Sequence, residues 1–352
     1  MAAAQLPYKQ LALFYFSGTG NARFAAHKIA AFAREKGVEA TVYNIAELKK
    51  DVPEIPESTL VGYCFPTHGF NAPPVLLKFI RKFPKGKNHV FLLNTRAGMR
   101  IGKLHTAGLG GLALWLPALL LLFKGYKTIG FRPLDLPSNW ISLHPGLTDK
   151  AIRFIVNHCE QTLERFTGKI LIGKPVLNGL LWLPADIIIT PVSVAYYFYG
   201  RFALAKTFFA SYKCTGCGVC IDNCPVGAIE LKNDRPYWTY SCESCMKCMN
   251  HCPHRAIETA HGYTFLLWWL AFSLLPLLII KLLVIMEVIS AAFYKNNFDF
   301  LFNGSSILFG LIIVFAGYKL LHQLLRVKII NKIITFTSLT HFRWWRRYKA
   351  PA

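Results

Sequence analysis

Eight cysteines in the second half of the chain have the spacing of ligands for iron–sulfur clusters. They form two copies of the pattern C-x2-C-x2-C-x3-C-P, at residues 214–225 and 242–253. Four thiolates can hold a cubane of four irons, and the short spacers allow three of them to come from one tight loop. Two structural zinc ions or a set of disulfides could also use eight cysteines. Zinc motifs, however, rarely repeat this spacing with a proline after the last cysteine. The pattern therefore predicts clusters.

The repeat resembles bacterial two-[4Fe–4S] ferredoxins over residues 214–253, and it continues beyond them. The segments 226–229 and 254–257 follow the two prolines in matching register, as they do in those ferredoxins. In that family the fourth ligand of each cluster comes from the other repeat. The resemblance implies one cluster on Cys214, Cys217, Cys220 and Cys252, and a second on Cys242, Cys245, Cys248 and Cys224.

The composition favours a membrane partner. Lysine and arginine number 40 against 18 acidic residues, and 53% of the 352 residues are hydrophobic. The basic residues flank long apolar stretches, which is typical of attraction to an anionic membrane surface. No motif supports nucleic acid as a partner. Residues 1–9 do not read as a signal peptide, so the cysteine-rich domain is placed in the cytoplasm. Cys64 and Cys159 are expected to be buried free thiols.

The amino-terminal half is expected to form an α/β sheet. Apolar runs at 10–16, 39–45, 59–65, 88–94 and 127–131 alternate with helical stretches. This alternation predicts a doubly wound parallel sheet, because buried parallel strands read as nearly continuous apolar runs. The length of the chain suits two or three domains.

A small polar loop joins the first strand to a helix that ends at Gly37. The loop consists of Ser17, Gly18, Thr19, Gly20 and Asn21. Backbone N–H groups and hydroxyls at a helix N-terminus point at an anion, so the loop predicts a phosphate site.

This loop resembles the phosphate loop of flavodoxins, with Ala22 where those proteins usually have a further threonine. The resemblance implies FMN, not FAD, at the carboxyl ends of the strands. Two more loops are then expected at the flavin ring. They are Pro66, Thr67, His68, Gly69, Phe70 and Asn71 after the third strand, and Asn94, Thr95, Arg96, Ala97 and Gly98 after the fourth. His68 either lies near the ring or is a satisfied loop histidine. Arg96 either favours the reduced flavin or is a solvated surface arginine.

Three further segments surround this domain. Residues 106–123 are apolar without a polar face, and Pro117 interrupts them. They are expected either to be buried or to contact the membrane or its helices. Residues 136–141 resemble a segment of flavodoxin–ferredoxin fusions, and Trp140 lies either near the flavin or in simple packing. Residues 147–167 are expected to form a closing helix, followed by Gly168.

Residues 176–200 are apolar enough to span a membrane. A single span here would put the two cofactor domains on opposite sides of the bilayer. Pro184, Asp186 and Pro191 also lie within the segment. They predict broken helices at the membrane interface instead of a span.

The carboxyl end is expected to form a transmembrane hairpin. Residues 264–293 and 304–324 are the two candidate spans, and 294–303 the loop between them. Lys281 is expected to snorkel or to pair with Glu287. The basic residues after 324 place both ends of the hairpin in the cytoplasm. The segment 343–349 is expected to be an interfacial anchor.

The chain as a whole resembles membrane-attached flavodoxin–ferredoxin fusion proteins. The expected parts are 1–168, a flavodoxin-like FMN domain; 169–206, an apolar connector; 207–260, a ferredoxin domain; 261–325, a transmembrane hairpin; and 326–352, a basic cytoplasmic tail. The fold class is therefore an α/β flavodoxin-like sheet with a small α+β ferredoxin domain and a helical hairpin.

Two functions fit this organisation. The first is a membrane-bound electron-transfer protein that relays electrons between FMN and two [4Fe–4S] clusters, and exchanges them with a redox protein or a lipid-soluble acceptor. The second is an iron–sulfur flavoprotein oxidoreductase whose FMN reduces a quinone or an isoprenoid-like substrate directly. No second nucleotide-binding unit is visible in the sequence, which disfavours direct oxidation of a nicotinamide.

Overall fold

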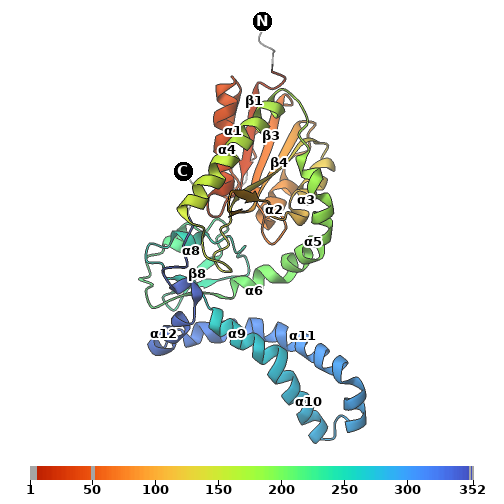
Figure 1. The fold of residues 1–352 in the computed structure, drawn as a ribbon, viewed down its shortest axis with the longest axis vertical. Coiled ribbons are helices and arrows are strands. Elements are labelled where there is room, and N and C mark those ends of the chain that lie inside the picture. Colours follow the sequence, from red (N-terminus) through yellow and green to blue (C-terminus); the bar gives the residue numbers. More distant parts are fainter. Residues whose placement is uncertain (1–5, 49–51, 349, 351–352) are drawn as a thin grey trace.

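The computed structural model of the protein describes residues 6–48, 52–348 and 350. Three parts follow one another from top to bottom in Figure 1. An α/β domain comes first, and a small domain that contains the eight motif cysteines lies against its lower end. A long helical hairpin projects from the small domain to the lower right.

The α/β domain is built on a parallel sheet, as the sequence predicted, with its strands in the order β2-β1-β3-β4-β6. These strands span Glu39–Asn44, Gln10–Tyr15, Thr59–Pro66, His89–Ile101 and Lys127–Pro137. The short strand β5 (Leu104–Thr106) pairs antiparallel with the end of β4. Every residue of β3 from Thr59 to Phe65 is buried, as expected for a central strand covered on both faces.

Helices cover both faces of the sheet. On one face α1 (Asn21–Glu35) packs beside α4 (Asp149–Leu171), and on the other α2 (Pro74–Lys82) lies beside α3 (Trp115–Leu122). The closing helix α4 is longer than predicted and continues through Gly168, which was expected to follow its end. Gly168 has open space around it. Cys64 and Cys159 are buried free thiols, as predicted.

The apolar stretch 106–123 forms only a short helix. It contains a 3₁₀ turn, η1 (Gly111–Ala113), and then α3, in which Pro117 lies in the first turn. Proline is tolerated in a first turn, so the prediction that it interrupts a helix is wrong. Leu122 and Phe123 are left 64% and 75% exposed, so part of this apolar segment faces outward.

The connector forms one continuous helical run and is not broken as predicted. It consists of η2 (Asn178–Trp182), α5 (Leu183–Ala195), a π-helical turn η3 (Tyr196–Gly200) and α6 (Arg201–Ala205). Pro184 stands at the start of α5, where its missing N–H costs nothing, and Pro191 is accommodated inside the helix. In Figure 1 this run descends along the right side of the α/β domain and turns in beneath it.

The cysteine-rich domain contains two small antiparallel sheets and two short helices. Strand β7 (Phe208–Ala210) pairs with β10 (Ile257–Thr259), and β8 (Ile229–Lys232) pairs with β9 (Arg235–Trp238). The helices α7 (Val219–Asp222) and α8 (Lys247–His251) each contain the third cysteine of a motif, Cys220 and Cys248. The domain is thus closed by pairing its first strand with its last.

The hairpin differs from its prediction in the position of the turn. Its first arm is α9 (His261–Trp269), a π-helical turn η4 (Leu270–Leu274) and α10 (Leu275–Ile285); its second arm is α11 (Ala291–Leu324). The turn therefore lies at 286–290 instead of 294–303, and Ser290 caps α11 by accepting a hydrogen bond from the Phe293 amide. Gly310 and Gly317 allow close packing of the two arms, since a methyl group on either would clash with Phe272 or Leu267.

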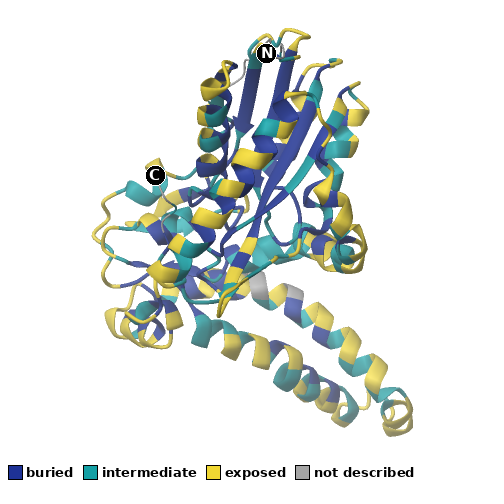
Figure 2. Ribbon diagram, turned by 45° about the horizontal axis from the view of Figure 1, so that its top comes forward, coloured by how far each residue is buried: buried dark blue, intermediate teal, exposed yellow. Residues whose placement is uncertain are grey.

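Two helical runs among the described residues are long and apolar enough to cross a membrane, 178–205 and 261–285. Their mean hydropathies are 1.5 and 2.3. The predicted span 304–324 lies within α11, where some side chains fall outside the described part of the chain. Figure 2 shows that the hairpin surface is mostly exposed or intermediate, in contrast to the buried strands of the sheet.

Candidate functional site

The phosphate loop has the geometry of an anion cradle at the start of α1. The Gly20 amide donates to Ser17 Oγ at 3.1 Å, and Gly20 has a φ of 113°, a conformation that favours glycine. The loop leads directly into a helix of 15 residues, whose N-terminus attracts negative charge. Asn21 is held by its Nδ2, which donates to the Pro137 carbonyl at 3.0 Å. These residues fit a terminal phosphate group.

The second predicted loop lies beside the first. The Thr67 amide donates to the Thr95 carbonyl at 2.9 Å, and Asn94 Nδ2 donates to Thr67 Oγ1 at the same distance. Burial lowers the pKa of His68 to about 4, so the ring is neutral at physiological pH. Its Nδ1 has no hydrogen-bond partner and lies 3.8 Å from Glu243 of the cysteine-rich domain. Burial raises the pKa of Glu243 to about 7.

The third predicted loop, Asn94 to Gly98, is not a loop. Strand β4 continues through these residues because β6 pairs with them, up to Gly98 opposite Pro137. Arg96 is not a solvated surface residue either. Its Nε and Nη2 donate to the two carboxylate oxygens of Asp135 at 2.8 and 2.9 Å, and it stacks 4.3 Å from the Trp182 ring centroid. Its charge is therefore already matched within the protein.

The three predicted segments line one cavity. Other parts of the chain, which were not predicted as cofactor-binding residues, complete its wall. The predicted lining residues that do border the cavity are Ser17, Gly18, Thr19, Asn21, Pro66, Thr67, His68, Gly69, Thr95, Arg96 and Ala97. Gly20, Phe70, Asn71, Asn94 and Gly98 lie outside this lining. The remaining wall comes from Ala22, from Pro137 to Trp140, from Tyr196, and from Ser244, Cys245 and Met246. The segment 136–141 was the only signal for this wall in the sequence.

The cysteine-rich domain closes this cavity directly. A methyl group on Gly18 would lie 2.6 Å from the Cys245 carbonyl oxygen, so the phosphate loop and a cysteine motif are in contact. Likewise, a methyl group on Gly69 would lie 2.0 Å from the Tyr196 ring. The open volume is only about 80 Å³, less than ligand sites usually offer.

The motif cysteines form two groups. Cys214, Cys217, Cys220 and Cys252 line a second cavity. Cys224, Cys242, Cys245 and Cys248 lie close enough for their charges to influence one another. The two groups are those that the ferredoxin resemblance implied. Among the described residues, no three His, Cys, Asp or Glu side chains are placed to hold a single metal ion.

In both motifs a backbone amide donates a hydrogen bond to the sulfur of the fourth cysteine. The Ala228 amide donates to Cys224 Sγ and the Ala256 amide to Cys252 Sγ, both at 3.2 Å. Hydrogen bonds to the ligand sulfurs are one means of setting a cluster's reduction potential. Burial raises the pKa of Cys220 to about 11 and that of Cys245 to about 12. Metal ligation needs the deprotonated thiolates, so binding of a cluster would release protons from these cysteines.

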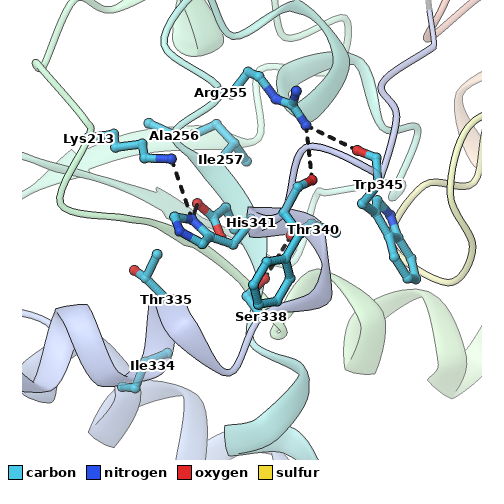
Figure 3. A network of polar contacts seen from close by, with 12 residues as sticks. Lys213, Arg255, Ala256, Ile257, Ile334, Thr335, Ser338, Thr340, His341 and Trp345 are labelled. Carbon is cyan, nitrogen blue, oxygen red and sulfur yellow. Dashed lines mark hydrogen bonds and ion pairs between the residues drawn. The ribbon is translucent and has the colours of Figure 1, made fainter.

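The end of the chain packs between the two domains, so the buried Trp345 and Tyr348 do not face the membrane as the predicted anchor required. Trp345 is 4% exposed and Tyr348 is fully buried, whereas Trp344 is 56% exposed. Arg255 of the cysteine-rich domain donates to the Phe342 carbonyl. It also donates to the Trp345 carbonyl, as Figure 3 shows. The hydroxyl of Tyr348 donates to Asn21 Oδ1 in the phosphate loop. Lys349 lies outside the described residues.

Comparison with known proteins agrees with this division. A family model described as "Flavodoxin" matches residues 13–99, and one described as "4Fe-4S dicluster domain" matches residues 213–257. The chain therefore combines a flavodoxin domain with a 4Fe–4S dicluster ferredoxin domain. This combination supports an electron-transfer role that uses FMN and iron–sulfur chemistry.

Several solved structures are similar to the first half of the chain. A flavodoxin from the domain Archaea is 17% identical, with 46% of this chain and 98% of that chain covered and a TM-score of 0.29. Rubredoxin oxygen:oxidoreductase from Desulfovibrio gigas is 15% identical, with 47% and 37% covered and a TM-score of 0.28. General stress protein 14 from Treponema denticola, solved in complex with FMN, is 16% identical, with 50% and 98% covered and a TM-score of 0.26. No curated protein matches the chain.

Proposed function

We propose that the protein is attached to the cytoplasmic membrane and relays electrons between FMN and two [4Fe–4S] clusters, delivering them to a reductive reaction there. The observation that carries this proposal is the contact between Gly18 of the phosphate loop and Cys245 of the second motif. FMN can exchange electrons in pairs and singly, and clusters carry one each. A cluster on Cys224, Cys242, Cys245 and Cys248 would thus adjoin the flavin.

The other four cysteines extend the path away from the flavin. Cys217 is exposed, whereas Cys242 is buried. A cluster on Cys214, Cys217, Cys220 and Cys252 is therefore the one that a soluble redox protein can approach. The order along the path is solution partner, outer cluster, inner cluster and flavin.

The connector supports attachment to the membrane because its polarity is inverted: it buries polar side chains and exposes apolar ones. Its buried polar residues Asp186 and Ser193 lie seven residues apart, which is two helical turns, and both face the flavodoxin domain. Asp186 accepts from the Gly110 and Gly111 amides and from Trp115 Nε1, and Ser193 donates to the Phe70 carbonyl. Ile188 and Phe198 on the outer face are 79% and 71% exposed. A helix anchored along a folded domain in this way lies on a membrane and does not cross it.

Helix α12 (Lys328–Phe336), at the base of the hairpin, has the same inverted polarity. Asn331 and Thr335 are buried, and Asn331 Nδ2 donates to the Leu325 carbonyl. Ile329 and Phe336 are both 71% exposed. The basic residues Lys328 and Lys332 accompany them, as suits the cytoplasmic face of a membrane.

Anaerobic purification with iron, sulfide and flavin analysis tests the proposal. We expect about eight irons and one FMN per chain. Replacing Cys252 with serine should remove the outer cluster, lower iron to about four and leave FMN in place. About four irons in the unaltered protein, FAD in place of FMN, or no flavin would contradict the proposal.

A second candidate function is direct reduction of a lipid-soluble substrate by this protein. It is favoured by an apolar cavity that shares two residues with the flavin site. Turnover of such a substrate by the purified protein, without a partner protein, would support it. Strict dependence on a partner that purifies in equal amount would support the relay alone.

A further inference from the structure

A larger cavity lies where the connector meets the base of the hairpin. Its volume is about 380 Å³, within the range of small-molecule sites. In Figure 1 this is the region where α6 passes above α9. Tyr196 and Ala203 line it from the connector, Leu267 and Trp268 from α9, Ile313 from α11, and Trp140 from the segment after β6.

One layer of aromatic side chains separates this cavity from the flavin site. Trp140 and Tyr196 line both cavities, and their ring centroids lie 5.8 Å apart in an edge-to-face arrangement. Hydride transfer needs the reacting atoms about 3–3.5 Å apart, which the intervening rings prevent. Electrons can cross such a layer. A ligand in the cavity is therefore placed for electron transfer.

The lining selects a flat apolar molecule with a hydrogen-bond acceptor. Among the described lining residues, Lys206 is the charged one. Its ammonium group donates to the Trp238 carbonyl and lies 4.3 Å from the Tyr240 ring centroid and 4.5 Å from that of Tyr318. The Tyr237 ring centroid lies 5.1 Å away as well. An ammonium group has three donors, and a ligand carbonyl can reach one of them on the side of Tyr318, which lines the cavity. The other walls are largely aromatic and aliphatic.

The cavity is also reached from the lipid side. Trp268 on α9 is 49% exposed on the hairpin, which the sequence predicts to lie in the bilayer. A ligand with an apolar tail can therefore enter without passing through water.

We propose that this cavity binds a quinone-class lipid, with the ring between Trp140 and Lys206 and the tail along α9. The inference rests on the proposed function, which supplies the electrons. Reduction of a quinone to its quinol takes up two electrons, passed through the Trp140–Tyr196 layer, and two protons, taken from water.

Binding of a benzoquinone with a short alkyl tail tests the proposal, using the full-length protein with its cofactors in lipid nanodiscs. The probe should quench tryptophan fluorescence saturably, and a photoreactive form should label residues of the cavity. Ala203→Phe fills the cavity and should weaken binding by about tenfold or more. Ile188→Phe is the matched control, because this exposed connector residue faces away, and it should bind as the unaltered protein does.

Flavin and iron contents report whether Ala203→Phe folds. If Ala203→Phe does not fold, Leu143→Trp fills the cavity from the segment after β6, because Leu143 lines the cavity and is 57% exposed. Unchanged affinity in a folded cavity-filled variant would overturn the proposal, as would labelling at another site. Equal competition by an alkyl lipid without a ring would also overturn it, because the cavity would then hold a structural lipid. Electron exchange between clusters and flavin is measured without quinone, so it tests the proposed function separately.

Discussion

At the scale of single residues, buried polar side chains fix the connector and the phosphate loop. Asp186 is 3% exposed and accepts hydrogen bonds from three N–H donors of the segment 110–115. In the sequence this carboxylate stands in an apolar stretch with no partner nearby. Its role becomes clear only when the partner segment, more than seventy residues earlier, is in place.

We predict that Asp186→Ala destabilises the protein by about 3 kcal/mol, because it leaves three buried N–H groups without an acceptor. Ile187→Ala is the control, since the adjacent side chain is 62% exposed. Thermal denaturation of both variants in the same detergent measures the difference. Equal midpoints would show that the Asp186 contacts contribute nothing to stability.

Tyr348 joins the carboxyl end to the phosphate loop through Asn21, which also donates to the Pro137 carbonyl. Tyr348→Phe keeps the buried ring and removes the hydroxyl. We predict that the dissociation constant for FMN rises about threefold to tenfold, because the Asn21 amide is less firmly oriented. Equilibrium titration of flavin into the cofactor-depleted protein gives this value, and an unchanged constant would contradict the role of the hydroxyl.

At the scale of elements, the connector and α12 expose apolar side chains and bury polar ones. We predict that a spin label at Ile188→Cys is accessible to oxygen, which concentrates in lipid, and protected from a water-soluble nickel complex. A label at Glu164→Cys, on the exposed face of α4, should show the opposite pattern in the same vesicles. Accessibility to the nickel complex at both positions would show that the connector does not lie on the membrane surface.

Local patterns predicted those elements whose formation depends on neighbours in sequence. The apolar strands, the loop Ser17–Asn21 and the two cysteine motifs could be predicted for this reason. The extension of β4 through Asn94–Gly98 could not, because it depends on pairing with β6. The continuous connector was missed because the sequence does not show that Pro184 starts a helix or that Asp186 meets Gly111. Tyr196 and Cys245 reach the flavin cavity only through contacts between domains.

At the scale of the whole molecule, the two redox domains are joined by the connector and again by the end of the chain. After the hairpin, the chain returns across the ferredoxin domain to the phosphate loop, and Figure 1 shows its carboxyl end beside the lower part of the flavodoxin domain. The Trp345 indole donates to the Ile141 carbonyl, and the Tyr348 amide donates to Asn250 Oδ1. Trp345 and Tyr348 thus hold the second cysteine motif, residues 242–253, against the flavin site.

We predict that deletion of residues 343–352 slows electron transfer between clusters and flavin, because the domains separate and tunnelling falls steeply with distance. Membrane attachment and iron content should be retained, since the hairpin and all eight motif cysteines remain. Trp344→Ala is the control, because it alters an exposed side chain of the same segment. Rapid-mixing absorbance after reduction of the clusters measures the rate. An unchanged rate in the deletion variant would mean that the connector alone holds the domains at working distance.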